Sequence, residues 1–142
     1  CVTIFFTMKT VISVVCAVIQ NMDNSVLIAR RSGGHLDGFW EFPGGKVEVD
    51  ESLNEALVRE IKEELNLSII VNRHIISSLY NYPHISVQLE AFLCSTDDIV
   101  VKSSAHSAVR FIPIFDLNKY NIAPADVPIV NLLTKMNCFI EE

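Results

Sequence analysis

The residues of this chain best suited to do chemistry are three glutamates, Glu60, Glu63 and Glu64, spaced i, i+3 and i+4. On a helix this spacing places all three carboxylates on one face, within reach of a single bound ion. Like charges this close repel one another, and a divalent cation removes the repulsion, because hard oxygen ligands suit Mg²⁺ or Mn²⁺. The spacing therefore predicts a metal site on a helix rather than an ordinary solvated face.

Other residues precede the glutamates in a fixed order. Gly44 and Gly45 are expected to let the backbone turn tightly and present carbonyl or amide groups to a ligand. Glu51 follows in the next loop, and Arg59 comes directly before the glutamates. From Gly45 onward the whole pattern reads Gly-x5-Glu-x7-Arg-Glu-Ile-x-Glu-Glu-x-Asn-Leu.

This segment, Gly45 to Leu67, resembles the signature of the Nudix hydrolases, and the rest of the chain is similar to the MutT-like branch of that family. One position departs from the signature, because its Gly near the helix end is Asn66 here. We expect this position to take the left-handed conformation that closes a helix, and Asn is the next best residue for it after Gly. The resemblance implies a Nudix fold, in which a mixed sheet is held between helices.

The resemblance also implies how the site works. Cleaving a pyrophosphate linkage requires neutralised phosphate charge and an activated water, and a metal ion held by Glu60, Glu63 and Glu64 supplies both. The Gly44 carbonyl is implied as an additional ligand. The implied cofactor is Mg²⁺ or Mn²⁺.

Arg59 is the remaining charged residue of the signature helix. Its guanidinium never loses its charge and offers a planar fork of donors, so we expect it to orient Glu60 or Glu51 rather than contact substrate. Glu51 is then a carboxylate that supports the metal ligands from behind. For Glu60 two roles stay open, namely metal ligand and general base.

MutT-like members tend to carry one more acidic residue in a loop after the central strands. The matching segment here, residues 103–107, reads Ser-Ser-Ala-His-Ser and contains no carboxylate. Three alternatives stay open: a water fills the ligand position, His106 fills it, or the alignment shifts and Asp97 or Asp98 serves.

Substrate contacts are predicted outside the signature. Arg30 and Arg31, at the end of the second predicted strand, are candidates for triphosphate contacts. Phe42 and Trp40 are candidates for stacking on a base, with one of them expected in the core.

Asp126 lies in Ala-Pro-Ala-Asp-Val-Pro, residues 123–128, which is similar to a stretch that opens the last helix of MutT-like enzymes and supplies a base-reading side chain. An ionised Asp accepts hydrogen bonds but donates none, so it suits the amine of cytosine or an N–H edge of guanine. Asp126 also fits the N-cap of the last helix, and both roles can hold at once.

Composition limits the class of protein. With 142 residues and 50% hydrophobic content, we expect one compact domain over residues 8–142, preceded by an extension over residues 1–7. A net charge of −6 argues against a nucleic-acid polymer as partner. The apolar run 11–19 is too short to span a bilayer. The four cysteines show no Cys-x-x-Cys spacing and predict reduced thiols of a cytoplasmic protein.

Periodicity and turn residues predict an α+β sandwich with a mixed sheet. Strands are expected at 10–20, 25–31, 40–42, 69–80, 85–94 and 109–111, and helical segments at 52–65, 113–119 and 126–137. The first two strands, joined by turn residues 21–24, are expected to form a β-hairpin. Asp50 and Ser52 are the candidate N-caps of the first helix.

Together these features predict a metal-dependent pyrophosphohydrolase that converts a nucleoside triphosphate and water to the monophosphate and pyrophosphate. Oxidised dGTP and CTP or dCTP are the leading substrates, with a role in clearing unwanted nucleotides. One alternative is an ADP-ribose pyrophosphatase, because that group often carries a Pro near the position of Pro83. Another is a Nudix-fold module that senses a nucleotide without catalysis. The sequence leaves the oligomeric state open.

Overall fold

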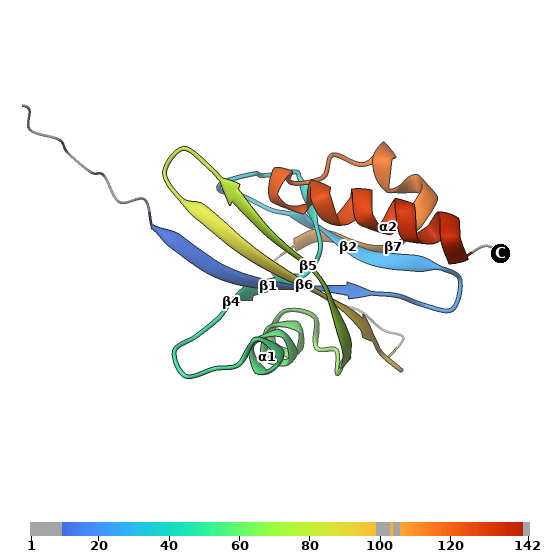
Figure 1. The fold of residues 1–142 in the computed structure, drawn as a ribbon, viewed down its shortest axis with the longest axis horizontal. Helices are drawn as coiled ribbons and strands as arrows, with labels where there is room; N and C mark the ends of the chain where they lie inside the picture. Colours follow the sequence, from blue (N-terminus) through green and yellow to red (C-terminus); the bar gives the residue numbers. More distant parts are fainter. Residues whose placement is uncertain (1–9, 99–102, 104–105, 141–142) are drawn as a thin grey trace, which may run out of the picture.

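The computed structural model describes residues 10–98, 103 and 106–140, with side chains described as far as residue 136. The predicted extension, residues 1–7, lies outside the described residues. The described part contains seven strands, two α-helices and two 3₁₀ helices, which confirms the predicted α+β class (Figure 1). In chain order the elements are β1 (Val11–Ile19), β2 (Ser25–Arg31), β3 (Trp40–Glu41), β4 (Gly44–Lys46), α1 (Leu53–Leu65), β5 (Ile70–Asn81), β6 (Ser86–Ser95), β7 (His106–Pro113), η1 (Ile114–Lys119), η2 (Pro124–Asp126) and α2 (Val127–Ile140).

The strands form two sheets. One is a mixed four-stranded sheet in the order β4-β1-β6-β5, and the other is a three-stranded sheet in the order β3-β2-β7. In the larger sheet β1 runs parallel to β6, while β4 and β5 are antiparallel to their neighbours. Every pairing in the smaller sheet is antiparallel. The predicted mixed sheet is therefore present, together with a second sheet that was not predicted.

The predicted hairpin between β1 and β2 is wrong. The two strands follow one another through a turn at Asn24, whose φ is 58°, but only an isolated bridge between Gln20 and Val26 joins them. Both edges of β1 are already occupied, by β4 on one side and β6 on the other. The residues 15–19 are buried without alternation, as expected for a central strand covered on both faces. The chain therefore moves to the second sheet after this turn.

Two hydrophobic clusters hold the layers together. One lies between the large sheet and α1, and the other joins the two sheets to η1 and α2. Figure 1 shows α1 on one side of the strands and α2 on the other, as a sandwich requires. No helix in the described part of the chain is long and apolar enough to cross a membrane.

The first helix has both of its predicted ends. Ser52 is the N-cap and forms a capping box with Glu55, each side chain accepting from the other residue's backbone N–H. Asn66 closes the helix in the left-handed region, with φ 53° and ψ 34°, and its N–H donates to the carbonyl of Lys62. Helix α1 also buries its apolar stripe, which consists of Ala56, Leu57, Ile61 and Leu65. The prediction for Asn66 is confirmed.

The C-terminal half differs from prediction in its boundaries. Strand β7 extends well beyond the predicted segment 109–111, and the turn after it is a 3₁₀ helix. The last helix begins at Val127, which puts Asp126 at the N-cap position, but the Asp126 side chain makes no hydrogen bond to a described backbone N–H of this helix. The Asp126 side chain instead contacts the backbone of Phe42 far away in sequence.

Candidate active site

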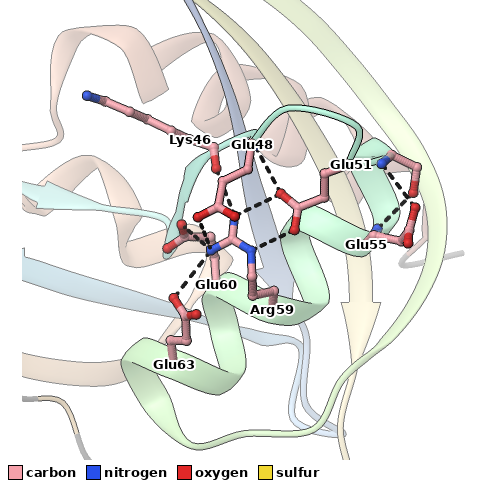
Figure 2. Close-up of polar contacts among 8 residues, drawn as sticks. Lys46, Glu48, Glu51, Glu55, Arg59, Glu60 and Glu63 are labelled. Carbon is pink, nitrogen blue, oxygen red and sulfur yellow. Dashed lines mark hydrogen bonds and ion pairs between the residues drawn. The ribbon is translucent and has the colours of Figure 1, made fainter.

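Arg59 joins the signature loop to the signature helix. Its guanidinium donates to both carboxylate oxygens of Glu51, at 2.6 and 2.8 Å, and to the carbonyl of Lys46 at 3.1 Å. It also donates to Glu60 at 2.9 Å and to Glu63 at 3.3 Å. Figure 2 shows the guanidinium surrounded by these acceptors. One side chain thus ties β4, the following loop and α1 into one unit.

Charge and hydrogen bonding hold Glu51 ionised. The fork from Arg59, followed by the hydrogen bond from the backbone N–H of Glu48, lowers the pKa of Glu51 to about 2. The same contacts raise the pKa of Arg59, above all those with Glu51 and Glu60. The expectation that Arg59 orients Glu60 or Glu51 matches this geometry, in which it contacts both.

The two glycines serve close approach rather than the predicted tight turn. Both lie in β4, and neither has a positive φ. A Cβ on Gly44 would stand 1.9 Å from the backbone oxygen of Val15, and one on Gly45 would stand 2.3–2.7 Å from carboxylate atoms of Glu60. Gly44 therefore lets β4 pair with β1, and Gly45 leaves room for the Glu60 carboxylate.

A pocket of about 330 Å³ lies beside this unit, where the two sheets diverge. The large sheet, which includes β4, contributes Val14, Val15, Cys16, Gly44, Gly45, Lys46 and Leu89. The small sheet and the segments flanking its strands contribute Arg31, Ser32, Gly33, Glu41, Phe42 and His106. Glu64 from α1 and Asp126 from η2 complete the lining. The pocket thus brings the signature helix together with the predicted base-reading residue.

Glu64 is the signature carboxylate that faces this pocket without a partner. It is half-buried and makes no hydrogen bond or ion pair with any described residue. Burial, followed by the nearby charges of Glu60 and Glu41, raises its pKa to about 7, although His106 and Arg31 act in the opposite direction. A half-buried, unpaired carboxylate beside other acids favours a bound cation.

The donor set fits a hard divalent cation, but the glutamates do not form a closed site. No group of three or more His, Cys, Asp or Glu side chains among the described residues is arranged to hold a metal ion. Glu60 and Glu63 are engaged by Arg59, and Glu63 is 62% exposed. The predicted convergence of Glu60, Glu63 and Glu64 on one ion would require Glu63 to exchange Arg59 for the ion.

The loop that lacks a carboxylate does place His106 in the pocket. The His106 side chain is 7% exposed, with Nε2 3.8 Å from Glu41 and Nδ1 2.9 Å from the hydroxyl of Ser103. Asp98 lies elsewhere and accepts from the backbone N–H of Ser68. Asp97 lines a different cavity near the β1–β2 turn. Of the predicted alternatives that are side chains, only His106 is at the pocket, while residues 104–105 lie outside the described residues.

The two predicted arginines separate. Arg31 lines the pocket and forms an ion pair with Glu41 at 3.3 Å, whereas Arg30 does not line it. The pairing of β2 with β7 is irregular between these two residues, and only Arg31 of the two lines the pocket. Arg30 instead donates to Ser107 and lies over the ring of Trp40. Glu41 was missed in the sequence, although alternation along β2 and pairing with β3 could have indicated it.

Phe42 and Asp126 also line the pocket. The backbone N–H of Phe42 donates to Oδ2 of Asp126 at 2.8 Å, and both side chains are buried. Trp40 is also buried, in the same core cluster as Phe42, so neither ring is an open stacking surface. Burial raises the pKa of Asp126 to about 7, so its protonated form, which can donate, is available near neutral pH.

Comparison with known proteins defines the class. The model of the NUDIX domain family matches residues 10–133, and the chain belongs to this family. The predicted Nudix resemblance, hydrolase class and fold are therefore confirmed.

Among similar proteins, CTP pyrophosphohydrolase of Escherichia coli (strain K12) is 34% identical over 120 residues, which cover 84% of this chain and 88% of the relative. The 8-oxo-dGTP diphosphatase of Buchnera aphidicola subsp. Schizaphis graminum (strain Sg) is 32% identical over 127 residues, or 89% of this chain and 96% of the relative. A solution NMR structure of the DNA mismatch repair protein MutT from methicillin-resistant Staphylococcus aureus 252 is 40% identical with a TM-score of 0.73, and covers 90% of this chain and 99% of that one.

Proposed function

We propose that this protein is a metal-dependent nucleoside triphosphate pyrophosphohydrolase that releases a nucleoside monophosphate and pyrophosphate. The leading substrates are 8-oxo-dGTP and CTP or dCTP, and the proposed setting is the clearing of unwanted nucleotides in the cytoplasm. One observation carries the proposal. A single pocket is lined both by Glu64 of the signature helix and by the buried carboxyl of Asp126.

The metal end of the pocket would be formed by Glu60, Glu63, Glu64 and the Gly44 carbonyl. Bound there, Mg²⁺ or Mn²⁺ would neutralise phosphate charge and acidify a water. Arg59 donates a hydrogen bond to Glu60, whose carboxylate lies beside Gly45. Through its hydrogen bonds to Glu51, Arg59 also fixes the position of the helix relative to the preceding loop. If Glu63 bound the ion in place of Arg59, the bonds to Glu51 and Lys46 would still fix the guanidinium.

Of the two arginines predicted as candidates for triphosphate contacts, Arg31 is the one proposed to make them. Its guanidinium lies in the pocket wall, and its partner Glu41 engages only one of its nitrogens, at 3.3 Å. The remaining donors can bind phosphate oxygens in the planar geometry that a guanidinium offers. His106 stands beside Glu41 and completes this polar wall.

Asp126 is the proposed base-reading group, with Phe42 holding it in place. One carboxyl oxygen is occupied by the Phe42 N–H, which leaves Oδ1 for the substrate. Because the pKa is about 7, the group can accept when ionised and donate when protonated. This suits bases with an amine or ring N–H edge, as in cytosine and guanine derivatives.

A substrate panel tests the proposal. The protein would be assayed with CTP, dCTP, dGTP, 8-oxo-dGTP and ADP-ribose, with Mg²⁺ and then Mn²⁺, scoring pyrophosphate release and the nucleotide product. Hydrolysis in ¹⁸O-labelled water identifies the phosphorus atom that is attacked. We expect pyrophosphate and a nucleoside monophosphate, but no nucleoside diphosphate. The ¹⁸O label would be in the monophosphate if the α-phosphorus is attacked and in pyrophosphate if the β-phosphorus is attacked.

Three other outcomes would contradict the proposal. Orthophosphate with a nucleoside diphosphate as the first products would refute the assigned reaction. Turnover of ADP-ribose alone would assign the alternative pyrophosphatase activity. Binding of nucleotides without turnover, with either metal, would identify a nucleotide-sensing module instead.

A further inference from the structure

A cluster of cationic and aromatic side chains lies on the face of the small sheet away from the pocket. Trp40 on β3, Arg30 on β2 and Arg110 on β7 occupy adjacent strands, and none of them lines the pocket. The guanidinium carbon of Arg30 lies 5.7 Å from the centroid of the Trp40 ring, and that of Arg110 lies 5.5 Å from it. Two like charges are thus held on one indole.

Neither arginine of this cluster is neutralised by an acid. No described Asp or Glu oxygen forms an ion pair with Arg30 or Arg110, although the chain has 17 acidic and 11 basic residues. By contrast, Arg59 pairs with four glutamates and Arg31 with Glu41. An attraction to the indole favours each cation, but it does not remove the repulsion between the two.

The donors of the cluster remain available. The Nε of Arg30 donates to the Ser107 hydroxyl at 2.8 Å, which fixes the side chain while leaving both terminal nitrogens without a partner among the described residues. Arg110 is exposed, and its guanidinium has no hydrogen bond to a described side chain or backbone group. A guanidinium presents its paired N–H groups in the geometry of phosphate oxygens, and such charged hydrogen bonds are strong.

We infer that Arg30 and Arg110, arranged on Trp40, bind a phosphate-type oxyanion at a site separate from the pocket. Pyrophosphate suits it better than orthophosphate, because a diphosphate has one phosphoryl group for each guanidinium. Bound anion would also relieve the repulsion between the two cations. The inference is independent of the proposed function, in which pyrophosphate happens to be a product.

The position of Trp40 provides the measurement, because it is the only tryptophan of the chain. Sodium pyrophosphate would be titrated into the full chain in EDTA, at constant ionic strength set with NaCl, while Trp40 emission is recorded. We expect a saturable change, because an anion that pulls a guanidinium off the indole alters the surroundings of the ring. Arg110→Gln and Arg30→Gln should each weaken the apparent affinity by tenfold or more.

Two matched variants remove the same charge elsewhere. Arg73→Gln changes an exposed arginine on β5, and Arg31→Gln changes the arginine of the pocket wall. Both should titrate like the unmodified protein. Equal affinity in Arg110→Gln, or loss of the signal only in Arg31→Gln, would overturn the inference, as would the absence of a saturable change.

A second measurement avoids substitutions, in case a variant fails to fold. Arginine Nε–Hε NMR signals of the unmodified protein would be followed during the same titration. Signals of Arg30 and Arg110 should shift together with the Trp40 indole N–H, while that of Arg73 stays in place. Unchanged Arg30 and Arg110 signals at saturating pyrophosphate would refute the site. The absence of triphosphate hydrolysis would leave this result unaffected, so the two proposals fail separately.

Discussion

Compared with the unmodified protein, the Asp126→Asn variant is expected to be more stable at alkaline pH than it is at acidic pH. The side chain is 6% exposed, and burial raises its pKa from 3.8 to about 7. The folded state therefore prefers the neutral carboxyl. Its stabilising contribution is complete below pH 3.8 and is lost as the pH rises through about 7. Asn has a similar shape, never ionises, and can still accept from the Phe42 N–H.

The size of the effect follows from the shift. A pKa difference of about 3 units corresponds to about 4 kcal/mol between the acidic and alkaline limits. Between pH 5 and pH 8, about 2–3 kcal/mol of this difference is expressed. For a domain of this size, each kcal/mol moves the melting temperature by about 2–4 °C. The melting temperature of the variant, relative to that of the unmodified protein, should thus be roughly 5–10 °C higher at pH 8 than at pH 5.

Urea denaturation at both pH values measures this difference directly. All other titrating groups are the same in the two proteins. The difference between their free energies of unfolding therefore changes with pH only through Asp126. Asp116→Asn provides the control, because Asp116 is a half-buried carboxylate paired with Lys119 on η1. The difference in free energy of unfolding between this variant and the unmodified protein should be the same at both pH values. Parallel pH profiles for Asp126→Asn and the unmodified protein would refute the buried, neutral carboxyl.

Three further outcomes are expected. Glu64→Gln should lower kcat/KM by at least about 100-fold at limiting Mg²⁺ while retaining the circular dichroism spectrum, because it removes the free carboxylate of the pocket, and near-normal turnover would contradict its role as a ligand. Gly44→Ala should cost about 1–3 kcal/mol in urea denaturation, because the added methyl meets the Val15 backbone, whereas Gly45→Ala should mainly reduce turnover, because it displaces the Glu60 side chain. Equal effects of the two substitutions on stability and turnover would contradict this division. Asp126→Asn should also shift the kcat/KM ratio of dCTP to 8-oxo-dGTP by roughly tenfold to a hundredfold, and an unchanged ratio would show that the group does not read the base.

The helix of the signature could be predicted closely because its determinants are local. The capping box at Ser52, the apolar stripe and the left-handed Asn66 all depend on residues within a few positions of one another. The contacts of Arg59 with Glu51 and Glu60 also follow from one loop and one helix. Such features need no knowledge of the tertiary fold.

The errors concern contacts between distant segments. The hairpin prediction failed because the pairing of β1 with β6 involves residues more than 70 positions away, which local turn residues at 21–24 do not reveal. The glycines were assigned to a turn, whereas their need for space arises from Val15 and Glu60. Asp126 was a plausible N-cap until the fold brought Phe42 to its side chain.

Which strand face an arginine occupies also depends on the fold. The adjacent residues Arg30 and Arg31 are equivalent by composition, and alternation establishes only that they diverge. The tertiary fold decides the direction, because one face of the small sheet joins the cluster that contains α1, through Leu27, and the other joins the cluster that contains η1 and α2, through Val26 and Ile28.

Because β1 and β2 belong to different sheets, the pocket is lined by residues of both sheets and lies at the boundary between them. The residues proposed to bind the metal lie on β4 of the large sheet and on α1, whereas Arg31, Glu41 and Phe42 lie on the small sheet and on the segment that follows β3. In the proposed function, the distance between the metal site and Asp126, the proposed base-reading residue that Phe42 contacts, would therefore depend on the relative orientation of the two sheets. Substitutions in the core between the sheets, without any contact to a nucleotide, would lengthen or shorten that reach. In such an architecture the choice of substrate can change through packing while every residue of the signature stays the same.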